Sequence, residues 1–410
     1  MTKIISEAIY GIKFKGIEKL NCTKLVAFIS ESDKWYHNLR LRKIFPRLLA
    51  KIVLNRYKYV TKEEKGDKVI LFAYNEPLYR KDVYAMMLNI FSCADNASFI
   101  QYEKNVSPCG LQASLKRLSL AIQWYGQMKE TGLTIKQKVV VVDTLLDAII
   151  KCDLVKPYLN YKALVVRYDA FLDNAVSQFF KINGRLTITA QHGVMCATRE
   201  VPHYGIWFRA FVSHYFMAWD EMTKKEAIKD GLKEHEVVVC GNPKCIDSVP
   251  CKKCCNHIMG VLLDGYDFIN QGLIDIANAY CKKNRYNYIL RYHPNYKGNE
   301  YDAKVNPSYY LKTERNSLAE YAESVEFTLM GNSTALLELL YMKHPCYVYT
   351  TDSDVEVYKG LIPQFHNIDE LEFLLKDNNY LEDVKKTLVT VKDARKGYTD
   401  FFNHINDILK

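Results

Sequence analysis

The feature that most constrains this chain is a repeated pattern in which a short apolar run ends in polar or small residues and a helix-forming segment follows. The pattern occurs at residues 186–190, 258–263, 288–290 and 327–330. Further strands are predicted at 24–30, 68–74, 163–167, 236–240 and 347–349, and the segment 111–156 is predicted to be helical with a break near Gly132. Short runs rich in β-branched and aromatic residues predict buried strands, and their alternation with helical segments predicts parallel sheets covered by helices. We therefore predict an α/β protein built from doubly wound, Rossmann-like sheets.

The length of the chain predicts two domains of this kind. With 410 residues, the chain is too long for one ordinary hydrophobic core. Its 49% hydrophobic and 25% charged residues are typical of a folded globular protein and not of a disordered one. A polar, cysteine-rich connection at 248–256 separates the two halves. We expect domains at 1–248 and 249–410 that face each other across a cleft, with C-terminal helices closing the chain.

Targeting and cysteine usage indicate a cytoplasmic protein. No apolar run approaches the roughly 20 residues that span a bilayer, and residues 1–7 lack the apolar core of a signal peptide. The 12 scattered cysteines fit reduced thiols. Cys251 and Cys254 have the spacing of a zinc pair, but a second properly spaced pair is missing. We therefore predict no metal site, although the cysteines between 240 and 257 leave the question open.

The net charge of +9 is concentrated in the segment 37–60, which is basic and contains no acidic residue. Ile44, Leu48 and Ile52 recur there at helical spacing, so a helix would be amphipathic. Such a helix suits an anionic membrane surface. It would equally suit a solvated face of the N-terminal domain. We expect no nucleic-acid partner, because no recognised binding motif accompanies the basic segment.

Polar residues follow two predicted strands of the second half. Arg291 and His293 come directly after the run 288–290 and point to the same side of an extended backbone. Two such donors at a strand end suit a monophosphate or diphosphate. Asp264 and Gly265 follow another strand and belong to the same edge of the sheet. Asp264 is interpreted as a group that positions an acceptor hydroxyl, as a base, or as a helix N-cap.

A second phosphate-binding feature precedes the helical run 335–340, where the chain reads Gly331-Asn332-Ser333-Thr334. The glycine allows a ligand to approach closely, and the two hydroxyls with the free N–H groups of a helix start suit a phosphate. Glu338 lies one helical turn deeper, on the face of Thr334. We interpret its carboxylate as a partner of ribose hydroxyls or of a neighbouring strand's backbone.

The first half carries candidate residues at corresponding places. The strand 186–190 runs directly into Gln191, His192 and Gly193, and the glycine leaves space for a ligand. His192 is interpreted as a general base, as a phosphate partner, or as a histidine satisfied by loop carbonyls. Asp169 follows an earlier strand and is a candidate base or an N-cap.

These motifs together resemble a known group. The order of Gln-His-Gly, Arg-x-His-Pro and Gly-x-Ser-Thr-Ala-x-x-Glu within 186–349 resembles that of GT-B glycosyltransferases of bacterial surface-polysaccharide synthesis. The most similar are capsule polymerases, polysialyltransferase-like enzymes, Kdo transferases and teichoic-acid glycerophosphotransferases. Val194 and Met195 follow Gly193, which differs from the teichoic-acid type. Walker loops, Gly-x-Gly-x-x-Gly, Gly-x-Ser-x-Gly and His-Glu-x-x-His motifs are absent from the sequence, which argues against the usual NTPases, dehydrogenases, α/β hydrolases and zincins.

The resemblance implies a glycosyltransferase that moves a sugar from a nucleotide-sugar donor to a growing or lipid-linked saccharide of a capsule, O-antigen or lipooligosaccharide. His293, Ser333 and Thr334 would contact the donor phosphate, Glu338 would hold the ribose, and His192 would be the base or a second phosphate contact. Direct displacement would need no metal and no cofactor, because helix ends and basic residues take the diphosphate charge. The implied location is the cytoplasm or the inner face of its membrane.

Two alternatives remain open at this stage. A sugar-nucleotide 2-epimerase shares the two-domain fold and the element His293-Pro294-Asn295, although its Asp-Ser-Gly-Gly before the donor helix is replaced here by residues 331–334. A non-catalytic polysaccharide- or membrane-binding protein with a degenerate cleft is the other. The sequence does not indicate the donor sugar, the nucleotide base, the acceptor, the stereochemical outcome or the oligomeric state.

Overall fold

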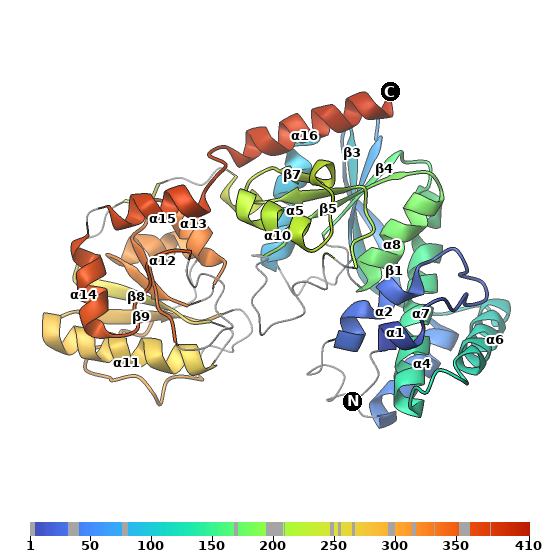
Figure 1. The fold of residues 1–410 in the computed structure, drawn as a ribbon, viewed down its shortest axis with the longest axis horizontal. Helices are drawn as coiled ribbons and strands as arrows, with labels where there is room; N and C mark the ends of the chain where they lie inside the picture. Colours follow the sequence, from blue (N-terminus) through green and yellow to red (C-terminus); the bar gives the residue numbers. More distant parts are fainter. Residues whose placement is uncertain are drawn as a thin grey trace. The chain divides into compact units, whose positions relative to one another are not determined.

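A computed structural model describes most of the chain and divides it into two compact units (Figure 1). The described residues are 5–31, 41–75, 81–167, 171–193, 208, 210–246, 250–252, 256–264, 267–293, 300–313, 317–331, 333–351, 361–377 and 379–410. Unit 1 comprises 1–197, 201–243 and 395–410, and unit 2 comprises 198–200 and 244–394. Each unit holds a parallel-rich sheet with helices, so the predicted pair of Rossmann-like α/β domains is confirmed.

Unit 1 is built on a 7-stranded sheet in the order β1-β3-β2-β4-β5-β6-β7. Its strands are β1 (Leu54–Glu64), β2 (Ile70–Tyr74), β3 (Ala97–Pro108), β4 (Ala163–Val166), β5 (Leu186–Ala190), β6 (Tyr215–Ala218) and β7 (Val237–Val239). All neighbours pair in parallel except β1 and β3, which form an antiparallel pair at one edge. The central strands β2 and β4 are buried along their whole length, as expected where helices cover both faces.

The helices of unit 1 supply the rest of its core. They are α1 (Ile5–Ala8), α2 (Cys22–Glu31), α4 (Leu41–Val53), α5 (Lys81–Ser92), α6 (Leu111–Gln127), α7 (Ile135–Val155), α8 (Phe171–Ile182), α10 (Glu221–Lys229) and α16 (Ala394–Leu409). The predicted break between α6 and α7 near Gly132 is confirmed, and α7 begins at a capping box formed by Thr134 and Gln137.

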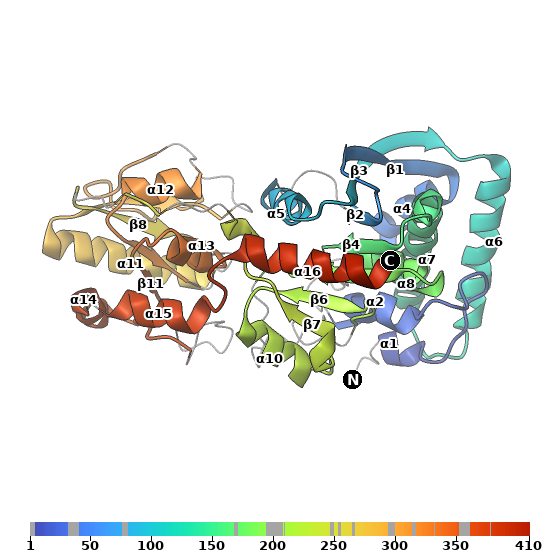
Figure 2. The ribbon, with the colours of Figure 1, turned by 90° about the horizontal axis from the view of Figure 1, so that it is seen from above.

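The last helix differs from expectation, because α16 packs on unit 1 although the chain reaches it from unit 2 (Figures 1 and 2). Its Phe402 is fully buried and lies 5.5 Å, between ring centroids, from Phe72 of β2. Gly397 lets the helix approach the segment after β7, since a Cβ there would lie 2.3 Å from the carbonyl oxygen of Cys240. The first unit therefore ends near residue 243 and includes the end of the chain, whereas the sequence suggests a boundary at 248 and a second domain that extends to 410.

Two local predictions in unit 1 are wrong. Residues 24–30 form part of helix α2 and not a strand, because Leu25 and Val26 pack into a helical core cluster with α7. In the basic segment 37–60, residues 37–40 lie outside the described part, the helix α4 ends at Val53, and the strand β1 begins at Leu54. From Leu54 onward, successive side chains point to opposite faces as in a strand, and this segment pairs with β3.

Unit 2 is a smaller α/β layer with a 4-stranded parallel sheet in the order β11-β10-β8-β9. Its strands are β8 (Ile258–Leu262), β9 (Asn287–Arg291), β10 (Thr328–Met330) and β11 (Cys346–Val348). Its helices are α11 (Asp267–Asn284), α12 (Leu318–Ser324), α13 (Ala335–Tyr341), α14 (Ile368–Lys376) and α15 (Tyr380–Leu388). All four predicted strands of this half are confirmed to within a residue or two.

Within the described ranges, no helix combines the length and the apolar character that crossing a membrane requires.

Candidate functional site

The carboxyl ends of β8, β9 and β10 lie next to one another in unit 2. Leu262 of β8 is in register with Arg291 of β9 on one side and with Met330 of β10 on the other. The residues that follow these strands therefore share one edge of the sheet, as predicted. We call this group the unit 2 rim, and it consists of Asp264, Arg291, His293, Gly331 and Ser333.

Arg291 ends β9 and is held by the start of α12. Its Nη1 donates to the backbone oxygen of Ser317 at 3.2 Å, and its guanidinium carbon lies 5.7 Å from the ring centroid of Tyr321. Burial lowers the pKa of Arg291 below its usual value, while the Tyr321 phenol and the carboxylates of Glu338 and Glu320 raise it. The group is a cation that has already lost much of its water, which favours a strong interaction with an anion. The negative charge of Glu338 keeps the guanidinium protonated and by itself opposes an anion.

Glu338 on α13 has a partner that the sequence did not indicate. Its Oε1 lies 3.6 Å from Nζ of Lys244, in the short 3₁₀ turn Pro243–Cys245, and both side chains are largely shielded from solvent. Neither interpretation from the sequence included a lysine. In the sequence, Lys244 is visible only as the residue that follows Asn242 and Pro243 after a predicted strand. Nothing local indicates that it pairs with Glu338, because that pairing depends on the tertiary fold. Lys244 adds a cation beside the rim.

Part of the loop before α13 caps that helix and is not free to contact a ligand through the same atoms. Oγ of Ser333 accepts the N–H of Ala335 at 3.3 Å, whereas the Thr334 side chain makes no capping bond. Ser333 and Thr334 are both half-buried. His293 is also half-buried and lies two residues beyond Arg291, just after β9. The hydroxyl of Thr334 is therefore not committed to capping.

The packing of α11 requires a glycine at position 331, whether or not a ligand binds beside it. A Cβ at this position would lie 2.5 Å from Cγ2 of Ile269 on α11 and 3.2 Å from Oδ2 of Asp264. Asp264 is buried, and its backbone N–H donates to Oδ1 of Asn270 at 2.6 Å while Nδ2 of Asn270 donates back to its carbonyl at 2.9 Å. The absence of a side chain at 331 is thus explained by the close approach of α11.

In unit 1, Gln191 links the ends of β5 and β6. Its Oε1 accepts the N–H of Trp219 at 2.6 Å, and its Nε2 donates to the carbonyl of Gly193 at 2.7 Å and to Oγ1 of Thr223 at 3.2 Å. The side chain is fully buried and its bonds hold the turn that carries His192. His192 itself is half-buried just beyond the carboxyl end of β5. Gln191 therefore positions His192, and a direct role for this amide in binding stays a prediction.

Three predicted site residues, Asp169, Gly265 and Asn332, lie outside the described residues. Among the described residues, no cluster of three or more His, Cys, Asp or Glu side chains could hold a metal ion. Of the cysteines considered for zinc, Cys240 is buried after β7 and burial raises the pKa of its thiol, while Cys254 and Cys255 lie outside the described part.

Comparisons with known proteins give a fold but no family. No family model matches the chain, and no curated protein matches its sequence. Among solved structures, S. aureus MnaA with UDP matches with a TM-score of 0.54 at 12% identity, over 83% of this chain and 97% of that one. A UDP-GlcNAc 2-epimerase of Neisseria meningitidis bound to UDP-GlcNAc matches with a TM-score of 0.50 at 12% identity, over 83% and 99%. Another UDP-N-acetylglucosamine 2-epimerase gives a TM-score of 0.52 at 13% identity, over 84% and 98%.

These likenesses extend over nearly the whole of the compared chains, so the protein has the two-domain, GT-B-like fold of these epimerase structures. They do not support a specific capsule-polymerase or polysialyltransferase family, which stays a prediction from the sequence.

Proposed function

We propose that this protein is an enzyme acting on a UDP-sugar, with 2-epimerisation as the first candidate reaction. Support comes from the fold shared with structures that hold UDP and UDP-GlcNAc, at a level of identity that concerns the fold alone. The observation that carries the proposal is the unit 2 rim, where adjacent parallel strands end beside two cations, Arg291 and Lys244. This edge of an α/β sheet is where nucleotides bind.

In this proposal the rim binds the nucleotide. Arg291, His293 and the hydroxyl of Thr334 contact the diphosphate, since charge-assisted bonds from a desolvated guanidinium are the strongest available there. Glu338, oriented by Lys244, accepts from the ribose hydroxyls. The diphosphate charge is taken by these side chains, and the proposal includes no metal ion and no further cofactor. His192, held by Gln191, and Asp169 are the candidate bases at the carboxyl ends of the unit 1 strands.

Glycosyl transfer is the second candidate. It is favoured by Gly331-x-Ser333-Thr334 and Glu338, which keep the pattern of the resemblance, and by the ion pair that fixes Glu338. In that case the partners are a nucleotide-sugar donor and a saccharide or lipid-linked acceptor. Both candidates place the protein in the cytoplasm, where its substrate would be found.

Nucleotide binding is tested first. We expect UDP to raise the thermal midpoint of the protein more than CDP, CMP, GDP or dTDP do. Lys244→Ala and Glu338→Gln should each weaken UDP binding about tenfold or more, as the loss of one charge-assisted bond predicts. Lys282→Ala, at an exposed position on α11, is the matched control and should bind UDP normally. Equal UDP binding by all three variants would contradict the proposed nucleotide site, in which Glu338 holds the ribose and Lys244 orients Glu338.

The reaction is tested by proton NMR of UDP-GlcNAc incubated with the enzyme in D₂O, without any acceptor. Inversion at C2 breaks the C2–H bond, so an epimerase should introduce deuterium there and produce the C2 epimer. A glycosyltransferase breaks the bond between the anomeric carbon and the diphosphate and should release UDP only when an acceptor is present. UDP binding with neither reaction would favour the non-catalytic alternative.

A further inference from the structure

Helix α6 of unit 1 carries a continuous apolar stripe on its outer face. Five large side chains spaced by four, three, four and three residues project from it: Leu111 (77% exposed), Leu115 (57%), Leu118 (41%), Ile122 (64%) and Tyr125 (37%). This spacing places all of them on one side of a helix. We call these residues the α6 stripe. Isolated exposed apolar residues are ordinary, but a row of this length marks a surface that contacts something.

The opposite side of α6 is firmly seated, so the stripe is a true outer face. Nη1 of Arg117 donates to the carbonyl of Lys51 on α4 at 3.0 Å, and Nε1 of Trp124 donates to the carbonyl of Lys15 at 2.9 Å. Arg117 and Trp124 are both buried. Figures 1 and 2 show α6 at the outer edge of unit 1 in both views. The helix could not turn the stripe inward without breaking these bonds.

The stripe lies on a helix without acidic residues. The one lysine of α6, Lys116, is exposed but lies roughly 140° around the helix from the stripe. At its end, Nζ of Lys138 lies 5.8 Å from the ring centroid of Tyr125. The neighbouring helix α4 also lacks acidic residues and exposes Phe45 and Leu49. An apolar row on a helix without acidic residues, ended by a tyrosine with a lysine beside it, is typical of a helix that lies in a membrane interface.

We propose that the α6 stripe docks unit 1 on an anionic phospholipid surface. The apolar side chains would enter the layer below the headgroups, while Lys138, beside Tyr125, would stay at the level of the phosphates. The helix has 17 residues and carries charge, so it would lie in the plane of the surface. The proposal is independent of the nucleotide-sugar function.

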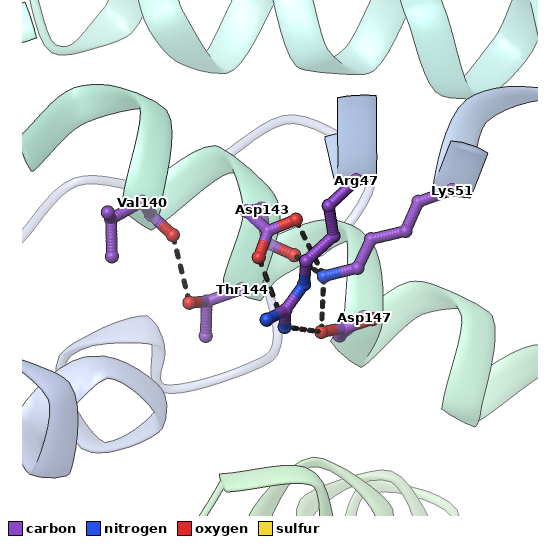
Figure 3. Close-up of polar contacts among 6 residues, drawn as sticks. All are labelled: Arg47, Lys51, Val140, Asp143, Thr144 and Asp147. Carbon is purple, nitrogen blue, oxygen red and sulfur yellow. Dashed lines mark hydrogen bonds and ion pairs between the residues drawn. The ribbon is translucent and has the colours of Figure 1, made fainter. Parts of the chain in front are cut away.

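This surface differs from the basic segment first considered for membrane binding. In α4, Arg47 and Lys51 are paired with carboxylates of α7 (Figure 3). Those two cations are therefore largely neutralised inside unit 1, and the α6 stripe supplies the apolar contact that charge alone would lack.

Co-sedimentation of the full chain with vesicles tests the proposal. We expect binding to vesicles of phosphatidylcholine mixed with phosphatidylglycerol and much weaker binding to phosphatidylcholine alone. Replacing Leu115, Leu118 and Ile122 together by Ser should lower the vesicle-bound fraction at least about tenfold, and Lys138→Glu should lower it less. Phe373→Ser, at a residue 74% exposed on α14 of unit 2, is the matched control and should bind like the unchanged protein.

The outcomes separate the possible occupants. Because the three substituted side chains are solvent-exposed, the triple variant should keep the circular dichroism and thermal midpoint of the parent. Equal vesicle binding by the triple variant and the parent would overturn the proposal. The proposal would also be overturned if the unchanged protein did not bind vesicles but sedimented as a dimer, and the triple variant sedimented as a monomer. That result would identify a second copy of the chain as the occupant.

Discussion

At the scale of single residues, the glycine at 331 shows how one position serves both packing and a candidate site. From the sequence, Gly331 indicates space for a ligand. In the structure, the space beside it is already occupied by Ile269 of α11, which is itself fully buried. A β-branched side chain on a helix has few alternative rotamers, so it cannot move aside easily.

We predict that Gly331→Ala destabilises unit 2 by about 1–3 kcal/mol, because the added methyl group overpacks the contact with Ile269. Urea unfolding would measure the change. Gly126→Ala on α6 is the control, since a Cβ there meets nothing within 4 Å and should stabilise the helix by about 0.5–1 kcal/mol. A Gly331→Ala protein as stable as the parent would show that α11 can adjust.

The ion-pair group between α4 and α7 also shows how burial determines the contribution of a charged residue to the free energy of unfolding. Nζ of Lys51 lies 2.6 Å from Oδ1 of Asp143 and 2.5 Å from Oδ2 of Asp147. Nη2 of Arg47 lies 3.3 Å and 3.5 Å from the same two carboxylates (Figure 3). The Lys51 side chain is only 7% exposed, whereas that of Arg47 is 42% exposed.

Lys51→Ala should therefore cost about 3–5 kcal/mol of unfolding free energy, because it leaves a largely buried Asp143 without its closest cation. Arg47→Ala should cost about 1 kcal/mol or less, as expected for an ion pair open to solvent. Chemical denaturation of both variants gives the comparison. Similar losses for the two would contradict the argument from burial.

At the scale of elements, His344 links two neighbouring strands of unit 2. It lies just before β11, is buried, and its Nε2 is 2.9 Å from Oγ1 of Thr328 at the start of β10. Burial lowers the pKa of His344 from 6.5 to about 4. The unfolded chain therefore takes up a proton at a higher pH than the folded one does, and the stabilisation is complete above about pH 6.5 and is lost as the pH falls toward 4.

When the pH is lowered from 7 to 5, this histidine should lower the unfolding free energy of unit 2 by about 2 kcal/mol. Hydrogen exchange of peptides covering β10 and β11 would report it as faster exchange through opening at pH 5, after correction for intrinsic rates. His344→Gln should remove most of this dependence, while His235→Gln, at an exposed position in unit 1, should leave it intact. Unchanged acid sensitivity in His344→Gln would assign the effect to other groups.

At the scale of the whole molecule, the return of α16 to unit 1 makes the stability of that unit depend on the end of the chain. Phe401 and Phe402 are buried against Tyr215 and Phe72, and Nζ of Lys162 donates to the carbonyl of Leu409 at 2.7 Å. The predicted second domain extends to residue 410, but these contacts place the last helix with the first unit.

Ending the chain before Arg395 should consequently destabilise unit 1 more than unit 2, because it exposes apolar surface of β2 and β6. Hydrogen exchange by mass spectrometry should show faster exchange in those two strands than in β8 and β10. Gly397→Ala should have a milder effect in the same strands, since its Cβ would meet the carbonyl of Cys240. Equal acceleration in both units would contradict this division.

Much of the fold could be predicted from sequence because its signals are local. Runs such as 163–167 and 258–263 are strands because their apolar, β-branched composition suits a buried parallel sheet. The same rule failed at 24–30, where an equally apolar run is the helix α2, since a short apolar run has no period of its own to distinguish a helix from a strand. At the candidate site, sequence spacing could place Arg291 and Gly331 at strand ends but could not supply Lys244 as the partner of Glu338.

By itself, the sequence determined the class of fold, the strands of unit 2 and the residues at their carboxyl ends, because each follows from side-chain composition within a few positions. Only the tertiary structure decided which strands are neighbours, that α16 belongs to unit 1, that Lys51 and Arg47 face α7, and that the apolar face of α6 stays outside. Those features depend on contacts between residues far apart in the chain, and a local pattern carries no information about which distant surface will cover it or leave it exposed.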